Sequence, residues 1–396
     1  MNPEDRRRDN LDRSGVSRPT RTMKLYFVAG EASGDTHGAA LMTALHQFRP
    51  KLVLLGRGGP RMRAVAGESF NDWSHESAVL GLWEVLKKYG YFRRQFAETF
   101  QEIREQRADA VVLIDYPGFN LRLARALRAQ MPQLKIIYYI SPQVWAWNRG
   151  RIPQMAKWLD LMLCIFPFEA DLYQQSGLRT IFVGHPMIEN LEAKRVGLPR
   201  DPNLVGLFPG SRAREVRKLM PILLEVMREL HARRPELRFE IAAANEALAE
   251  TIRHHLLPLV DSLGEVALVV GQAAATMQRS AVGVVASGTA TLEAAFFRLP
   301  FVLIYKVAAL TYLAGRILIR VKHLGMPNVL AEREIVPEFI QGKAHSVAIA
   351  RAVMKLLNEP ARREQMVADL DAVIAKLGRG GANETAARAI LDAVET

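Results

Sequence analysis

The first group of residues able to do chemistry lies in a loop directly after an apolar run near the start of the chain. This loop, Gly30–Gly38, contains Glu31, Ser33, Gly34 and Asp35 within five positions. Its glycines permit a tight turn and a close approach of the backbone to a bound group. The alternative is a turn in which Ser33 or Asp35 caps the following helix. A turn alone does not require Glu, Ser, Asp and His together, so a ligand-binding loop is favoured.

A second loop, Ile114–Asn120, contains Asp115 at the end of another apolar run, and the chain turns at Pro117. Ligands of parallel sheets bind at the carboxyl ends of the strands, which is where Asp115 is expected. Partial burial would raise the pKa of this carboxylate and suit it to general base catalysis. An aspartate that caps the next helix is the alternative. Asn120 is a further candidate for contact with the same ligand.

A third loop, Ser141–Arg149, follows an apolar run and contains Trp145 and Trp147, with Arg151 close behind. Tryptophans next to arginines would form an apolar wall beside an anion-binding site. Ser141 and Trp145 are therefore candidate ligand contacts. The alternative is a loop whose tryptophans only cover the end of the sheet.

The second half of the chain contains two loops of the kind that binds phosphate. Gly210 and Ser211 lie between an apolar run and a long helical pattern, where their backbone N–H groups are free to face an anion. Arg212 adds a fixed cation next to them. The three residues together suit a diphosphate.

The second of these loops consists of Ser287, Gly288 and Thr289, again small residues before a helical pattern. Glu293, one turn into that helix, could accept hydrogen bonds from ribose hydroxyls. A capping box formed by Ser287 or Thr289 with a later acidic residue is the alternative. Asn328, in Gly325–Leu330, is a third candidate for contact with a nucleotide.

The sequence lacks the motifs of several other kinds of catalytic site. The chain has no serine nucleophile elbow of the GxSxG type, no HExxH and no GxxxxGK[ST] phosphate loop. Cys164 is the single cysteine and lies in an apolar run, so we interpret it as a core thiol. We therefore expect neither a catalytic metal nor a cofactor.

The elements that carry these loops are short apolar runs alternating with helical periodicity, which predicts parallel sheets with crossover helices. The predicted strands are 24–29, 110–114, 135–140, 161–165 and 180–183 in the first half, and 204–208, 238–242, 266–270, 282–286 and 301–305 in the second. Helices are predicted over 213–233 and 384–394. Two such series predict an α/β chain with two Rossmann-like, doubly wound domains that face a central cleft. The predicted divisions are a disordered leader over 1–22, domains over 23–190 and 191–380, and a C-terminal helix over 381–396.

The formal net charge of +12 implies an anionic partner, which would be a membrane surface, phosphorylated substrates or nucleic acid. No nucleic-acid-binding motif is present, so the first two are favoured. Residues 80–94 interleave Leu82, Trp83, Leu86 and Phe92 with two basic pairs, as interfacial membrane segments do. A core helix with a solvated basic face is the alternative. No uncharged apolar stretch reaches the roughly 18 residues of a membrane-spanning helix.

Taken together, these motifs resemble the lipid-A-disaccharide synthase family of glycosyltransferases. The similar segments of the first half are Ala29–Asp35, Ile114–Asn120, Ser141–Trp147, Phe166–Glu169 and Val183–Pro186. Those of the second half are LFPGSR, ASGTATLE and MPNVLA. The resemblance runs in order from about Met23 to Thr396. One departure is Gly118, where some members carry a second aspartate.

The resemblance implies the GT-B fold and a metal-independent, inverting transfer. Its donor would be UDP-2,3-diacylglucosamine and its acceptor 2,3-diacylglucosamine 1-phosphate, giving a β-1,6-linked disaccharide 1-phosphate and UDP. Asp115 would be the base, the first-half loops would bind the acceptor, and the second-half loops would bind UDP. The family also implies a peripheral place on the cytoplasmic face of the inner membrane, and a homodimer is possible.

Three rival functions share some of these features. A transferase of N-acetylglucosamine in peptidoglycan assembly and a UDP-sugar 2-epimerase would have the same nucleotide half but should lack the Ser141–Trp147 motif. A nucleic-acid-binding protein is suggested only by the basic charge.

Overall fold

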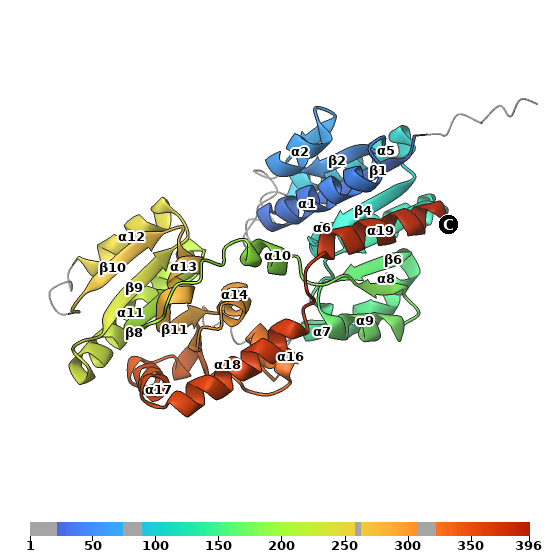
Figure 1. Cartoon of the computed structure of the whole chain (residues 1–396). Coiled ribbons are helices and arrows are strands. Elements are labelled where there is room, and N and C mark those ends of the chain that lie inside the picture. The colour runs from blue at the N-terminus through green and yellow to red at the C-terminus, as the bar shows by residue number, and fades with distance from the viewer. Residues whose placement is uncertain (1–21, 74–88, 258–262, 308–321) are drawn as a thin grey trace, which may run out of the picture.

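The computed structural model describes residues 22–73, 89–257, 263–307 and 322–396. Two parallel sheets, each flanked by helices, make up the two halves of the chain (Figure 1). Among the described residues the first sheet has the strand order β3-β2-β1-β4-β5-β6-β7 and the second the order β10-β9-β8-β11-β12-β13. Both orders extend outward in two directions from the first strand of their half, which is the doubly wound Rossmann arrangement. The fold class predicted from the sequence is confirmed.

The elements of the first half alternate between strand and helix. Its strands are β1 Lys24–Ala29, β2 Val53–Gly58, β3 Phe70–Asp72, β4 Ala110–Ile114, β5 Lys135–Tyr139, β6 Leu161–Cys164 and β7 Thr180–Phe182. Its described helices are α1 Ala32–Phe48, α2 Pro60–Ala66, α5 Tyr89–Gln106, α6 Pro117–Gln130, α7 Val144–Trp147, the 3-10 turn η1 Arg149–Arg151, α8 Ile152–Trp158, α9 Pro167–Gln174 and α10 Met187–Glu192.

The second half repeats this alternation. Its strands are β8 Asp201–Phe208, β9 Arg238–Ala243, β10 Val266–Val270, β11 Ser280–Ala286, β12 Phe301–Tyr305 and β13 Glu338–Ile340. Its described helices are α11 Ala213–Arg233, α12 Glu246–Leu256, α13 Ala273–Arg279, α14 Ala290–Phe296, α16 Met326–Ala331, the 3-10 turn η3 Gln341–Lys343, α17 Ser346–Asn358, α18 Pro360–Ala375 and α19 Ala382–Glu395.

The central strands are mostly apolar and buried beyond their first residues because helices cover both faces of each sheet. All five residues of β4 are buried, and Cys164 at the end of β6 is buried as the sequence predicts. Strand β2 lacks this signature, since it contains Gly56, Arg57 and Gly58. Arg57 is nevertheless only 2% exposed, because it pairs with Glu102 and Glu98 of α5. That buried ion pair explains why β2 does not stand out in the sequence.

The last helix, α19, packs against the first half of the chain and not the second (Figure 1). Arg49, after α1, forms a 2.8 Å ion pair with Glu395. The guanidinium of Arg388 lies 4.2 Å from the centre of the Phe48 ring. The chain therefore crosses between its two halves twice, once through α10 and once through residues 376–381.

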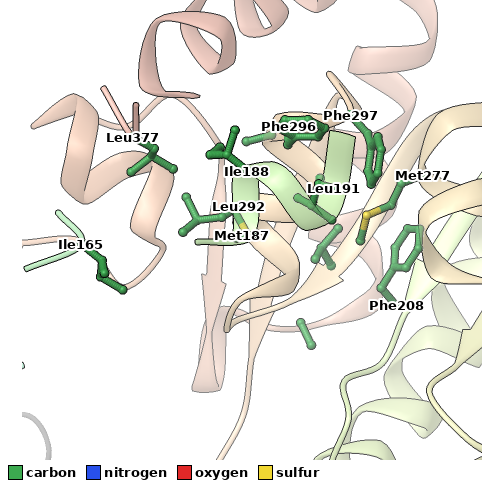
Figure 2. Packing of buried hydrophobic residues seen from close by; sticks show 14 of the residues in the cluster. Ile165, Met187, Ile188, Leu191, Phe208, Met277, Leu292, Phe296, Phe297 and Leu377 are labelled. Atoms are coloured by element: carbon green, nitrogen blue, oxygen red, sulfur yellow. The ribbon is translucent and has the colours of Figure 1, made fainter. Parts of the chain in front are cut away.

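The two crossings are fastened to each other. The His185 N–H donates a 2.8 Å hydrogen bond to the Leu377 carbonyl, and Glu189 accepts one from the Gly381 N–H. Figure 2 shows Met187, Ile188 and Leu191 of α10 among apolar side chains of both halves, including Ile165 and the α14 residues Leu292 and Phe296. Helix α10 is thus a shared core element and not a loose linker.

Candidate functional site

Asp115 follows β4 directly and has a left-handed backbone with φ 45°, as does Tyr116 with φ 49°. Residues other than glycine adopt this conformation at a cost, so the surroundings must hold it. The Asp115 N–H donates to the Tyr139 carbonyl at 3.0 Å. Its own carbonyl accepts from the Tyr138 hydroxyl at 2.5 Å and from Asn120 Nδ2 at 2.8 Å. The position of Asp115 is therefore fixed by three bonds from the neighbouring strand and helix.

Burial and, to a smaller extent, the nearby charge of Glu31 raise the pKa of the Asp115 carboxyl from 3.8 to about 6, against the opposing effect of the hydrogen bond from the Tyr116 N–H. Burial and the same Glu31 charge raise the pKa of Tyr116 to about 12. The structure thus brings Glu31 of the first loop together with Asp115 of the second. A carboxylate with this pKa suits proton abstraction from a hydroxyl near neutral pH.

The loops that follow β1 and β4 make close contact. A Cβ atom on Gly30 would lie 2.3 Å from Cδ1 of the Tyr116 ring, so only glycine fits there. Trp73 supports both loops, because its Nε1 donates to the Ala29 carbonyl at 2.6 Å and its ring meets the Tyr116 ring edge-on. The close approach of the Tyr116 side chain therefore explains why position 30 is a glycine.

Asp35 has a structural role that its motif did not indicate. Its carboxylate accepts three hydrogen bonds from backbone N–H groups: those of Gly59 at 3.1 Å, Arg61 at 3.1 Å and Met62 at 2.9 Å. It thereby caps α2, a different helix from the one the capping alternative assumed. Gly34 is also buried, whereas Glu31 and Ser33 are exposed at the edge of the sheet.

Asn120 is fully buried beneath the loop that carries Asp115. Its Nδ2 donates to the carbonyls of Ile114 at 3.1 Å and Asp115 at 2.8 Å. Within the described residues its Oδ1 has no hydrogen-bond partner. This side chain holds the backbone of Asp115 in place, and its burial gives no support to a direct contact with a ligand.

Ser141 and Trp145 converge on a residue that received no role in the sequence analysis. Both side chains are 5% exposed, and both donate to Oε1 of Glu169, at 2.7 Å and 2.9 Å. Trp147 on the same loop is 40% exposed. The outward side chain of the pair is therefore Trp147. Glu169 was visible only as the last residue of the Phe166–Glu169 motif.

In the second half, Gly210, Ser211 and Arg212 lie between β8 and α11, at the carboxyl edge of the sheet. Gly210 has φ 105°, which favours glycine. Arg212 is 63% exposed on its side chain and forms a 3.2 Å ion pair with Glu215. An exposed guanidinium beside free N–H groups at a helix start is well placed for an anion.

Ser287, Gly288 and Thr289 occupy the equivalent place between β11 and α14. Gly288 and Thr289 are exposed, and Gly288 has φ 140°. Glu293 is largely buried one turn later. Burial raises the pKa of its carboxyl, and the charge of Lys194 after α10 lowers it. The second phosphate-type loop therefore adjoins the segment that joins the two halves.

Asn328 is fully buried and its amide is completely occupied. Its Nδ2 donates to the Val336 carbonyl and to Oε1 of Glu338, each at 2.8 Å. Its Oδ1 accepts from the N–H groups of Ile335 at 2.8 Å and Val336 at 2.9 Å. These bonds fix the segment that leads into β13, so the interpretation of Asn328 as a nucleotide contact loses its basis.

The segment proposed to contact the membrane, residues 80–94, belongs only in part to the described residues. Leu82, Trp83 and Leu86 lie outside the described residues. Phe92 belongs to α5, is half-buried and packs against the apolar core of the first half. For Phe92 the structure supports the core alternative.

In the described ranges, no group of three or more His, Cys, Asp or Glu side chains could hold a metal ion. No helix of the described chain is long and apolar enough to cross a membrane.

Comparison with known sequences decides the family. The sequence pattern of the lipid-A-disaccharide synthetases matches residues 25–391, nearly the whole chain. The chain belongs to the lipid-A-disaccharide synthetase family. A lipid-A-disaccharide synthase of Geobacter sulfurreducens is 40% identical over 378 residues, which are 93% of this chain and 97% of that protein. One of Myxococcus xanthus is 37% identical and covers 94% and 98%.

Solved structures of other proteins share the fold of this lipid-A-disaccharide synthetase family member. UDP-GlcNAc 2-epimerase of Neisseria meningitidis, bound to UDP-GlcNAc, superposes with a TM-score of 0.61 at 12% identity, covering 93% of this chain and all of that one. MurG of Acinetobacter baumannii gives a TM-score of 0.56 at 12% identity, covering 94% and 99%. At this identity the likeness concerns the fold alone, which is GT-B as the sequence predicts.

Proposed function

We propose that this chain transfers 2,3-diacylglucosamine from UDP-2,3-diacylglucosamine to 2,3-diacylglucosamine 1-phosphate and releases UDP. Membership in the lipid-A-disaccharide synthetase family supports this glycosyltransferase reaction. The observation that carries the mechanism is Asp115, a desolvated carboxylate held in a left-handed turn at the ligand-binding edge of the first sheet.

In this mechanism, Asp115 accepts the proton of the acceptor 6-hydroxyl while the oxygen of that hydroxyl attacks C1 of the donor sugar. The bond between C1 and the UDP oxygen breaks on the opposite face, which inverts the anomeric configuration. Negative charge then develops on the departing diphosphate. Arg212 and the N–H groups at the starts of α11 and α14 would stabilise that charge.

The structure also refines the proposed set of binding residues. For the acceptor we retain Glu31, Ser33 and the loop that carries Ser141 and Trp145. Asp35 and Asn120 become supporting residues, because their polar atoms are bonded to the backbone. For UDP we retain Gly210, Ser211, Arg212, Ser287, Gly288, Thr289 and Glu293.

An assay with both substrates tests the function directly. Purified protein is mixed with UDP-2,3-diacylglucosamine and 2,3-diacylglucosamine 1-phosphate, and UDP and the disaccharide 1-phosphate are measured. A parallel reaction with UDP-N-acetylglucosamine tests the epimerase alternative, since many neighbours in fold are epimerases. Epimerised sugar without disaccharide would refute the proposal, as would salt-dependent nucleic-acid binding without affinity for UDP.

The rate of transfer should decrease as the pH falls through about 6, because Asp115 must be ionised to accept the proton. With a pKa of about 6, roughly a tenth of the carboxyl is ionised at pH 5, whereas an unshifted aspartate would remain almost fully ionised. In Glu31→Gln the inflection should move to lower pH, since one source of the shift is removed. An inflection below pH 4.5 in the unaltered protein would contradict this account.

We place the chain on the cytoplasmic face of the inner membrane as a peripheral protein. Its net charge of +12 and the acylated, anionic substrates of the proposed reaction favour such a surface. A homodimer is a further expectation, which sedimentation equilibrium would test.

Residues 80–86 should contribute to membrane attachment. A triple variant, Leu82→Ser, Trp83→Ser and Leu86→Ser, should lose binding to anionic vesicles in flotation while keeping its thermal transition. Phe92→Ser is the matched comparison. It should retain binding and lose about 1–3 kcal/mol of stability, because Phe92 packs on the core. Loss of the cooperative transition in the triple variant would identify its side chains as core.

A further inference from the structure

Glu169 is a buried carboxylate to which the proposed reaction assigns no role. It lies in the first turn of α9 and is 1% exposed. Its Oε1 accepts from Ser141 Oγ at 2.7 Å and Trp145 Nε1 at 2.9 Å, and its Oε2 accepts from the Phe166 N–H at 3.2 Å. One carboxylate therefore ties α9 to the loop after β5.

A second residue of the same helix strengthens this attachment. Tyr173 lies one turn after Glu169, is fully buried, and bonds through its hydroxyl to the Pro142 carbonyl at 3.1 Å and to Ser141 Oγ at 3.3 Å. The Trp145 ring also meets the ring of Phe168 edge-on, with 4.9 Å between centres. Helix α9 thus holds the loop by hydrogen bonds and by ring packing.

The loop needs this support because its backbone begins in an unfavourable conformation. Ile140, the residue before Ser141, has φ 63°, which is costly for a β-branched side chain. A buried carboxylate is itself costly, and burial raises the pKa of Glu169 to about 7. Among the described residues, no cation pairs with it. An apolar side chain would fill this place at lower cost, but it would leave Ser141 and Trp145 without their acceptor.

The loop lies at the same edge of the sheet as the neighbouring loop that carries Asp115, where the acceptor is expected. Strand β5 adjoins β4, and the Asp115 N–H bonds to the last residue of β5. Trp147 is exposed, and the Arg151 guanidinium lies 5.4 Å from the centre of its ring. Arg149 is exposed and donates from Nε to the Trp145 carbonyl at 3.1 Å. An indole and two guanidinium groups suit an anionic amphiphile.

We propose that Glu169 is a positioning residue: by holding Ser141 and Trp145, it sets the loop that presents Trp147 and Arg149 to an anionic, acylated acceptor. This inference rests on the proposed function. Glu169 acts through the loop and touches no substrate. Its loss should therefore weaken use of the acceptor and leave use of the UDP-sugar unaffected, because the donor binds in the other half of the chain.

Steady-state kinetics with each substrate varied in turn test this role. Glu169→Leu should raise the acceptor KM about tenfold or more and change the donor KM less than twofold. Glu169→Gln should have a smaller effect, because an amide oxygen can still accept from Ser141 and Trp145. Trp145→Phe, which keeps a ring and removes the N–H donor, should raise the acceptor KM in the same way. Asp171→Asn, on the exposed side of α9, is the control.

Each result decides a separate question. If Glu169→Leu does not fold, Glu169→Gln and Trp145→Phe supply the test. The double variant should raise the acceptor KM by less than the product of the two single fold-changes, because both substitutions act on the same hydrogen bond. Unchanged acceptor KM in these folded variants, or an equal rise of both KM values, would overturn the positioning role. If the unaltered protein makes no disaccharide from UDP-2,3-diacylglucosamine and the acceptor, the proposed function itself is wrong. The positioning role of Glu169, which rests on that function, is then wrong as well.

Discussion

Replacing Asp115 with asparagine should lower kcat by about a hundredfold to ten-thousandfold, the usual contribution of a general base. The amide keeps the shape of the side chain. The hydrogen bonds of the Asp115 backbone, to the Tyr139 carbonyl and from Tyr138 and Asn120, also remain. The loop should therefore stay in place while proton abstraction is lost. UDP affinity, measured by calorimetry, should change little because the loops that we propose for UDP lie in the other half.

The same variant should be more stable than the parent at pH 8. Burial raises the folded-state pKa of Asp115 to about 6 from 3.8, so its charged form is unfavourable in the folded protein. Stability is then greatest below the unfolded pKa and decreases as the pH rises through about 6. Asp115→Asn removes that penalty, and should gain about 1–3 kcal/mol at pH 8 and almost nothing at pH 3. A loss of activity together with a gain of stability distinguishes a catalytic residue from a structural one.

Glu31 provides the decisive comparison, because its charge lies near Asp115 and its carboxylate is exposed to the same region. Glu31→Gln should reduce the rate far less than Asp115→Asn. A loss below tenfold in Asp115→Asn, alongside a much larger loss in Glu31→Gln, would move the base to the first loop.

Most of the fold follows from the sequence, and the exceptions have physical causes. Strands β1, β4 and β12 and helix α11 have the predicted bounds, because their continuous apolar runs and three- to four-residue spacing report burial directly. Strands β2, β3 and β13 were not predicted. β2 contains a charged residue in a buried ion pair. The short strands β3 and β13 contain polar residues, Asn71 and Asp72 in β3 and Glu338 in β13, so neither forms an apolar run.

The candidate site was predictable as a set of loops but not in the roles of individual side chains. Asp35 and Asn328 are polar residues in strong motifs, yet their partners lie at Gly59 and Val336, and no local pattern shows which way a side chain turns. Gly118 is a further case. Its position has open space around it, so an aspartate there, as in some relatives, would meet no obstacle. A second carboxylate close enough to Asp115 to raise its pKa comes instead from Glu31, in a loop more than 80 positions away in the sequence.

Arg212→Ala should weaken UDP binding by about 1.5–3 kcal/mol, roughly tenfold to 150-fold in Kd, the range for a charge-assisted hydrogen bond. Arg212 lies between β8 and α11, is 63% exposed on its side chain, and within the described part of the chain its guanidinium pairs with Glu215 at 3.2 Å. Exposed pairs of this kind contribute little, so the guanidinium can turn to a diphosphate at small cost. Calorimetry with UDP should be run beside Arg217→Ala, an exposed cation further along α11 that removes the same charge. Equal losses in the two variants would indicate only long-range attraction, and unchanged affinity in Arg212→Ala would place the diphosphate elsewhere. A loss confined to Arg212→Ala that persists at high salt would establish direct contact, because screening removes the long-range part first.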